Sequence, residues 1–78
     1  MLDQKVTLIT GAAAGIGEGT AQLFAAHGAP VYVLDRNAAG ATAVAAAIQA
    51  KGGSAFAFAT DVTRPETIRP AVEDALSR

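Results

Sequence analysis

The sequence has no cysteine and no tryptophan, and only one histidine among its 78 residues. Without cysteine the chain has neither a disulfide framework nor a thiolate metal site, and His27 cannot build a metal centre alone. Basic charge is also scarce, because six Lys and Arg residues stand singly against seven acids and leave a net charge of −1. This balance lacks the basic stripe that neutralises a phosphate backbone, so we expect no nucleic acid partner and no metal.

Long hydrophobic runs are missing as well. The first apolar run covers only residues 6–9 and is followed by glycines, which excludes a membrane span and a signal peptide. We therefore expect a soluble, cytoplasmic protein with no membrane partner. What the chain has in excess is alanine, with 20 residues that raise the hydrophobic fraction to 51%. This composition predicts one small domain whose core is built from methyl groups rather than large side chains.

Three short apolar runs predict strands at residues 6–9, at 31–34 with Asp35 closing the run, and at 55–60. The segments between them have helical spacing. Ile16, Leu23 and Phe24 share one face of a helix that starts at residue 16 and ends at Gly28. We expect Gly19, within this helix, to allow close packing against the strand.

The second helix is predicted from Asn37, a good N-cap residue, with Ala41, Val44 and Ile48 on its buried face. A third helix follows the segment TRPE, in which Thr63 and Glu66 match a capping box. Its apolar face consists of residues 68, 72 and 76. Pro70 removes an amide donor inside this helix, so we expect an irregular first turn there.

Alternation of strands and helices at this spacing predicts an α/β fold with a parallel sheet and right-handed crossovers. The strand order is then 3-2-1, with the first two helices on one face of the sheet and the third helix on the other. The first strand is left as an open edge. We expect this edge to favour self-association, that is, a homo-oligomer.

The stretch TGAAAGIG at residues 10–17 lies between the first strand and the first helix. Glycine is needed where φ is positive or where a Cβ would collide with a phosphate, and Gly11, Gly15 and Gly17 stand where both conditions arise. A helix that starts there offers unpaired amides and the positive end of its dipole. The stretch therefore predicts a pyrophosphate-binding loop, with an ordinary strand-to-helix turn as the alternative.

Asp35 lies at the end of the second strand, where the ribose of a bound dinucleotide is expected. Its carboxylate can accept hydrogen bonds from ribose hydroxyls and repels a 2′-phosphate, whereas Arg36 can stack on adenine or accommodate that phosphate. Together these residues predict NAD as the cofactor, with NADP less favoured, unless Asp35 only caps the helix near Asn37.

TGAAAGIG, Asp35 and the pair DV at residues 61–62 together resemble the N-terminal, cofactor-binding part of a classical short-chain dehydrogenase/reductase. The resemblance implies a Rossmann-like sheet in a three-layer parent fold. Residues 1–78 are then a partial NAD(P)-binding domain whose second half is absent from this sequence. It further implies that Gly11, Gly15, Ile16 and Gly17 line the pyrophosphate and nicotinamide side, and that Asp61 and Val62 border the adenine. By the same resemblance, Ala14 stands where relatives that use NADP often carry a basic residue, which also favours NAD. Asp61 has a simpler alternative role, which is to satisfy backbone amides.

The family's chemistry needs a Tyr and a Lys one helical turn apart with a Ser nearby. The chain's one tyrosine, Tyr32, is predicted to lie in a strand, so we name no catalytic residue. The resemblance implies an NAD-dependent oxidoreductase acting on an alcohol or carbonyl substrate, whose activity this chain alone does not carry. The alternatives are a non-catalytic nucleotide-binding or interaction module that pairs with another chain, and a methyltransferase-type domain.

Overall fold

The protein is described by a computed structural model that covers residues 6–12, 15–61 and 63–77. The predicted alternation of strands and helices is confirmed, and the strand limits differ from the predicted ones by at most one residue. None of the helices in these ranges is long and apolar enough to cross a membrane. In chain order the elements are β1 (Thr7–Thr10), α1 (Gly15–Ala26), β2 (Val31–Asp35), α2 (Ala38–Ala50), β3 (Ala55–Ala59), the 3-10 turn η1 (Pro65–Thr67) and α3 (Arg69–Ser77).

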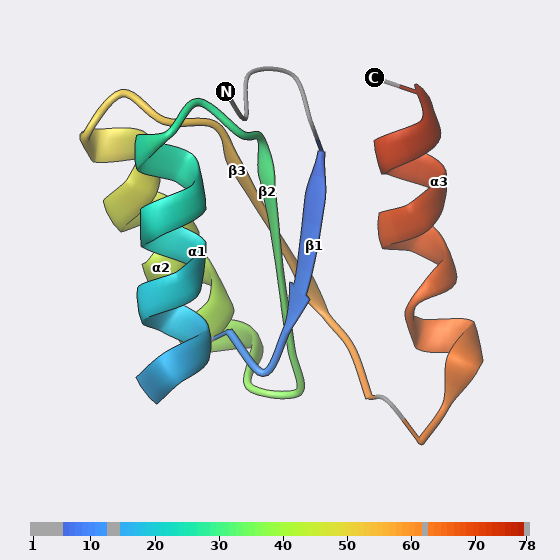
Figure 1. The fold of residues 1–78 in the computed structure, drawn as a ribbon. Coiled ribbons are helices and arrows are strands. Elements are labelled where there is room, and N and C mark those ends of the chain that lie inside the picture. Colours follow the sequence, from blue (N-terminus) through green and yellow to red (C-terminus); the bar gives the residue numbers. More distant parts are fainter. Residues whose placement is uncertain (1–5, 13–14, 62, 78) are drawn as a thin grey trace.

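The three strands form a parallel sheet in the order β1-β2-β3, as predicted. Val31 of the central strand is in register with Thr7 on one side and with Ala55 on the other. α1 and α2 cover one face of the sheet and α3 lies on the opposite face, which gives three layers (Figure 1). The two faces are filled differently because successive side chains of β2 point to opposite sides.

The face under α1 and α2 has a core of small and β-branched side chains. Val31 and Val33 of β2 pack there against the α2 residues Ala41, Val44 and Ile48, all of which are buried. The predicted face of α2 is thus confirmed. Its predicted N-cap is confirmed too, since the side chain of residue 37 accepts a hydrogen bond from the amide of residue 40.

The buried face of α1 differs from the prediction. Ile16 and Leu23 are 90% and 56% exposed, and of the three predicted residues only Phe24 packs partly against the core. Ala21 is fully buried in their place. α1 comes so close to the preceding backbone that a Cβ on Gly17 would lie 2.3 Å from the carbonyl oxygen of Gly11, and the larger side chains of Ile16 and Leu23 point outward.

Two other glycines of this region have different outcomes. Gly28 has φ of 93° just after α1, which confirms the predicted left-handed end of the helix. Gly19 is exposed, and a Cβ built on it would meet no atom within 4 Å. The expectation that Gly19 allows close packing against the strand is therefore wrong.

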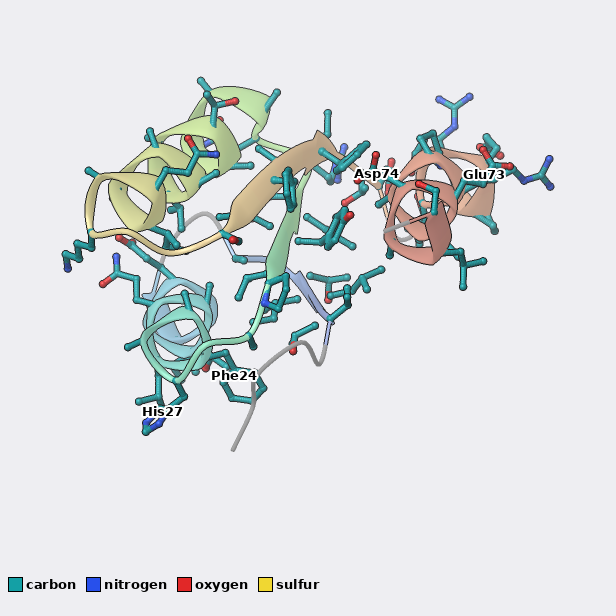
Figure 2. All side chains as sticks on the ribbon, turned by 90° about the horizontal axis from the view of Figure 1, so that it is seen from above. Phe24, His27, Glu73 and Asp74 are labelled. Carbon is teal, nitrogen blue, oxygen red and sulfur yellow. The ribbon has the colours of Figure 1, made fainter. Side chains whose placement is uncertain are left out.

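The face under α3 contains aromatic side chains. Tyr32 and Leu34 of β2 are buried with Ala71 of α3, and Phe56 and Phe58 of β3 pack against this cluster. Seen along the sheet in Figure 2, α3 stands alone on this side. This face of the sheet is thus covered by one helix and three large rings, whereas the other face is covered by two helices and many small aliphatic side chains.

The capping box predicted at the start of the third helix does not form. The amide and the hydroxyl of Thr63 both donate to the carboxylate of Asp61, at 2.9 Å and 2.7 Å, instead of pairing with Glu66. The carboxylate of Glu66 instead contacts Nε of Arg64 at 3.4 Å. η1 consequently starts after Arg64 without a side-chain cap.

The helix itself is confirmed, but it presents another face than predicted. Pro70 lies in the first turn of α3, after the separate 3-10 turn, so the expected irregular start is present. Val72 and Leu76 are 38% and 82% exposed, whereas Ala71 is buried and Asp74 is half-buried. Ala71 and Ala75 pack against the aromatic cluster, and Asp74 accepts a hydrogen bond from the hydroxyl of Tyr32, so this face of the helix is turned to the sheet.

Candidate functional site

The carboxyl ends of all three parallel strands lie along one edge of the sheet, and two adjoining depressions open there. One, of about 170 Å³, is lined by Gly11, Asp35, Arg36 and Thr60. The other, of about 210 Å³, is lined by Arg36, Thr60 and Asp61 together with residues 59 and 67. Because they share two lining residues, we describe them together as the strand-end groove. Ligands of open parallel sheets bind in this position.

The glycine loop forms one side of the site. Gly11 and Gly15 have φ of 65° and 63°, and a Cβ built on either would meet no atom within 4 Å. Gly17 is constrained from within, since its Cβ would lie 2.3 Å from the carbonyl oxygen of Gly11. We predicted that these positions need glycine because of a positive φ or a nearby phosphate. At Gly17 the need for glycine comes from the backbone of the loop itself, without any ligand.

α1 begins at Gly15, directly after this loop, and its first-turn amides have no acceptor within the helix. Ile16 projects from that turn and is 90% exposed. The open loop surface, the free helix end and the groove beside them match the needs of a pyrophosphate and the groups it joins. Two predicted site residues, Ala14 and Val62, lie outside the described residues.

Asp35 is the last residue of β2 and is half-buried in the groove. Its carboxylate accepts a hydrogen bond from the amide of Asn37 at 2.9 Å, so the alternative role near the start of α2 is real. The amide of Thr60 donates to the Asp35 carbonyl at 2.9 Å and ties the ends of β2 and β3 together. A carboxylate accepts several hydrogen bonds at once, so the contact with Asn37 is compatible with ribose binding.

Arg36 and Asp61 face each other across the groove, with 3.8 Å between Nε and Oδ2. The Arg36 side chain is 77% exposed and the Asp61 side chain 22%. Hydrogen bonds from the hydroxyl and amide of Thr63 hold the pKa of Asp61 below its ordinary value, and the charge of Arg36 adds to this effect. Asp61 therefore carries its negative charge at neutral pH and, as its alternative role required, also satisfies a backbone amide.

Two polar residues of the groove were not predicted as site residues. Thr60 is 4% exposed and lines both depressions. It is the last residue of the predicted strand 55–60 and directly precedes Asp61, so its position at the same edge of the sheet was a usable signal. The hydroxyl of Thr67 accepts the amide hydrogen of Asp61 at 2.7 Å, and nothing in the sequence marks this contact. In the described ranges no group of three or more His, Cys, Asp or Glu side chains could hold a metal ion.

The family described as short chain dehydrogenase matches residues 5–78 of the sequence. The chain belongs to this family, which confirms the resemblance drawn from residues 10–17, 35 and 61–62. Solved structures of a dehydrogenase and a reductase, with TM-scores of 0.90 and 0.86, confirm the Rossmann-like arrangement.

The 7alpha-hydroxysteroid dehydrogenase of Escherichia coli K12 is 44% identical over 77 residues, which are 99% of this chain and 30% of that protein. Cyclohexanol dehydrogenase of Acinetobacter sp. SE19 is 45% identical over 75 residues, or 96% and 30%. A 7alpha-hydroxysteroid dehydrogenase complexed with NADH and 7-oxo glycochenodeoxycholic acid has a TM-score of 0.90 at 45% identity, covering 97% of this chain and 30% of that one. The NADH complex of a 3-ketoacyl-(acyl-carrier-protein) reductase from Brucella melitensis has a TM-score of 0.86 at 47% identity, covering 99% and 30%. The chain thus spans about 30% of the length of these relatives.

Proposed function

We propose that the chain is the NAD(H)-binding part of an oxidoreductase that moves hydride between the cofactor and an alcohol or carbonyl substrate. The observation that carries the proposal is the strand-end groove, which has the glycine loop beside it and Asp35 within it. Two relatives of similar structure are complexed with NADH, which supports the same cofactor here. Family membership favours this function over a non-catalytic interaction module.

Each part of the groove suits one part of the dinucleotide. The open loop and the first-turn amides of α1 offer hydrogen-bond donors to the pyrophosphate, and Asp35 offers acceptors to the ribose hydroxyls. Asp61 and Arg36 border the space left for the adenine. The residues proposed to bind the cofactor are Gly11, Ala14, Gly15, Ile16, Gly17, Asp35, Arg36, Asp61 and Val62.

The charges of the groove favour NAD over NADP. The Asp35 carboxylate lies where a 2′-phosphate would approach, and two anions in that space repel each other. Arg36 could compensate, but its guanidinium is directed to Asp61 at 3.8 Å. The one basic side chain that lines the groove is therefore already paired with an acid.

The nicotinamide ring, when bound, supplies the hydride acceptor or donor. The chain's own residues bind and orient the cofactor, and none of those described is placed to move a proton to or from a substrate. Tyr32, the only tyrosine, is fully buried on the α3 face of the sheet. Activity of this chain by itself is not expected, and a cytoplasmic, homo-oligomeric protein remains our prediction.

The test is a pair of binding titrations of the intact protein with NADH and NADPH, followed by the fluorescence of the bound cofactor. We expect NADH to bind at least about tenfold more tightly, a difference of about 1.4 kcal/mol. Absence of binding of either cofactor would contradict the proposed function. Equal or reversed affinities would leave the function standing and overturn the role of Asp35.

A further inference from the structure

Tyr32 is an unusual residue for the centre of this sheet. It is fully buried, and its ring lies between those of Phe56 and Phe58, with centroid distances of 5.1 Å and 5.8 Å. Its hydroxyl donates a hydrogen bond to Oδ2 of Asp74 in α3, 42 residues further along the chain. A buried phenol needs such a partner, and a carboxylate acceptor makes the bond a strong one.

This hydrogen bond carries much of the attachment of α3. Ala71 is the only residue of the helix that is buried, and Val72 and Leu76 remain exposed. Figure 2 shows Asp74 on the side of α3 that is turned to the sheet and its neighbour Glu73 pointing the other way. Ala75 also packs against the aromatic cluster, so two alanines and this polar contact hold the helix on the sheet.

α3 is in turn connected to the groove by a continuous chain of hydrogen bonds. The amide of Asp61 donates to the hydroxyl of Thr67 in η1, and that hydroxyl also contacts the carbonyl oxygens of Asp61 and Arg64, at 3.1 Å and 2.8 Å. The amide of Ile68 donates to the carbonyl of Pro65 at 3.0 Å, and the amides of Ala71 and Val72 in α3 donate to the carbonyl of Ile68 at 3.1 Å and 3.2 Å. Hydrogen bonds thus link Asp61, through Thr67 and η1, to the first turn of α3.

We infer that the Tyr32–Asp74 hydrogen bond is a positioning contact for the cofactor site. By fixing α3 on the sheet it fixes the Asp61 side of the strand-end groove, so two residues outside the groove help determine the affinity for NAD(H). Tyr32 lies three positions before Asp35 in β2, about 10 Å from it, and touches no part of the proposed binding surface. The inference rests on the proposed function, because it assigns these residues to the support of that same site.

The test compares Tyr32→Phe and Asp74→Ala with the unmodified intact protein. Each variant removes one partner of the bond, and Tyr32→Phe keeps the ring between its two neighbours. We expect the dissociation constant of NADH to rise about fivefold in each, because the Asp61 side of the groove then holds its binding position in only part of the molecules. Asp74→Asn keeps an acceptor for the hydroxyl and is expected to stay within about twofold of the unmodified protein. Glu73→Gln is the matched control, since it neutralises the adjacent acid that points away from the sheet.

A purely structural role would lower stability without acting through Asp61, so the deciding measurement is a double-mutant cycle. In an Asp61→Asn background Tyr32→Phe should cause no further loss of NADH affinity, whereas in an Asp35→Asn background the fivefold loss should persist. An unchanged NADH affinity in Tyr32→Phe, or an equal loss in both backgrounds, would overturn the inference. If Tyr32→Phe does not melt cooperatively, the same cycle is carried out with Asp74→Ala, which alters no core residue. Failure of the unmodified protein to bind NADH would count against the proposed function instead.

Discussion

The proposed cofactor site has two ends, the glycine loop and the charged part of the strand-end groove beside it, and they are built from different groups. At the glycine loop the binding surface is backbone, because Gly11, Gly15 and Gly17 contribute no side chain beyond hydrogen. At the other end the surface consists of the charged side chains of Asp35, Arg36 and Asp61. In the proposed function one end offers amide donors to a phosphate, and the other distinguishes NAD from NADP by charge.

Their supports differ as well. The loop end is fixed by the apolar core under α1 and α2, in which close packing at Gly17 leaves no room for another side chain. The Asp61 end is fixed by hydrogen bonds through Thr67 and, across the sheet, through Tyr32. We therefore expect a substitution in the close-packed glycine loop to cause a large loss of cofactor affinity. Substitutions among the hydrogen-bonded side chains at the other end should cause smaller losses.

The largest effect is expected from Gly17→Val. Its Cβ would lie 2.3 Å from the carbonyl oxygen of Gly11, so the loop has to move. NADH affinity should fall about 100-fold or more, because overpacking of this kind costs about 1–3 kcal/mol and also removes the donors from their places. Fluorescence titration measures the loss, and far-ultraviolet circular dichroism should show that the helices remain.

Gly19→Ala is the matched control for that substitution. It lies two residues further in the same helix, where a Cβ meets nothing within 4 Å. NADH affinity should stay within about twofold, and the free energy of unfolding should rise by about 0.5–1 kcal/mol because alanine favours the helix. Equal losses for the two variants would show that the crowding at Gly17 is not what makes glycine necessary there.

A smaller effect is expected at the side-chain end from Asp35→Ala. Removal of the carboxylate takes away the acceptor for ribose hydroxyls and the repulsion of a 2′-phosphate. The preference for NADH over NADPH should fall by about tenfold or more, mainly through weaker NADH binding. Competition titrations with both cofactors test this, and an unchanged ratio would remove Asp35 from the specificity of the site.

Arg36→Ala should have a weaker effect again. Its ion pair with Asp61 has a distance of 3.8 Å and the arginine is 77% exposed, so its contribution to stability is at most about 0.5 kcal/mol. We expect NADH affinity to change about two- to threefold through lost contact with the adenine. A loss comparable to that of Asp35→Ala would show that the guanidinium carries more of the binding than its exposure indicates.

The smallest effect is expected from Thr63→Val, which removes the hydroxyl bonded to Asp61 at 2.7 Å. The pKa of Asp61, now below its ordinary value of 3.8, should rise toward it. Because the folded-state pKa is the lower one, the stability that Asp61 adds is complete above the unfolded value and is lost as the pH falls through the folded value. Carbon NMR of the carboxyl group follows the titration, and Thr63→Ser should retain the low pKa. An unshifted pKa in the valine variant would assign the effect to the amide and Arg36.

Much of the fold followed from residues whose role is local. Asn37 as N-cap, Gly28 at the end of α1 and the buried row of α2 were all predicted, because each depends on its own turn of chain. The glycine loop and Asp35 were found for the same reason. Parallel topology then placed their side chains at one edge of the sheet without further information.

The faces of α1 and α3 could not be predicted in the same way. Hydropathy gives weight to Ile16 and Leu76, yet each is more than 80% exposed, and alanines form the contacts instead. An alanine in the sequence does not show by itself whether it is buried, because that depends on the surface that packs against it. The hydrogen bonds of Asp61 with Thr67 and of Tyr32 with Asp74 join residues from separate elements, and no local pattern indicates them.

Tyr32 also makes the chain easy to follow optically. Within this sequence it is the only tyrosine and there is no tryptophan, so one ring accounts for the near-ultraviolet signal of these residues. The energy of a phenol's electronic transition depends on whether its hydroxyl donates to a carboxylate. The absorption band of Tyr32 therefore reports whether α3 is packed on the sheet. It can be followed without a label in a stopped-flow experiment.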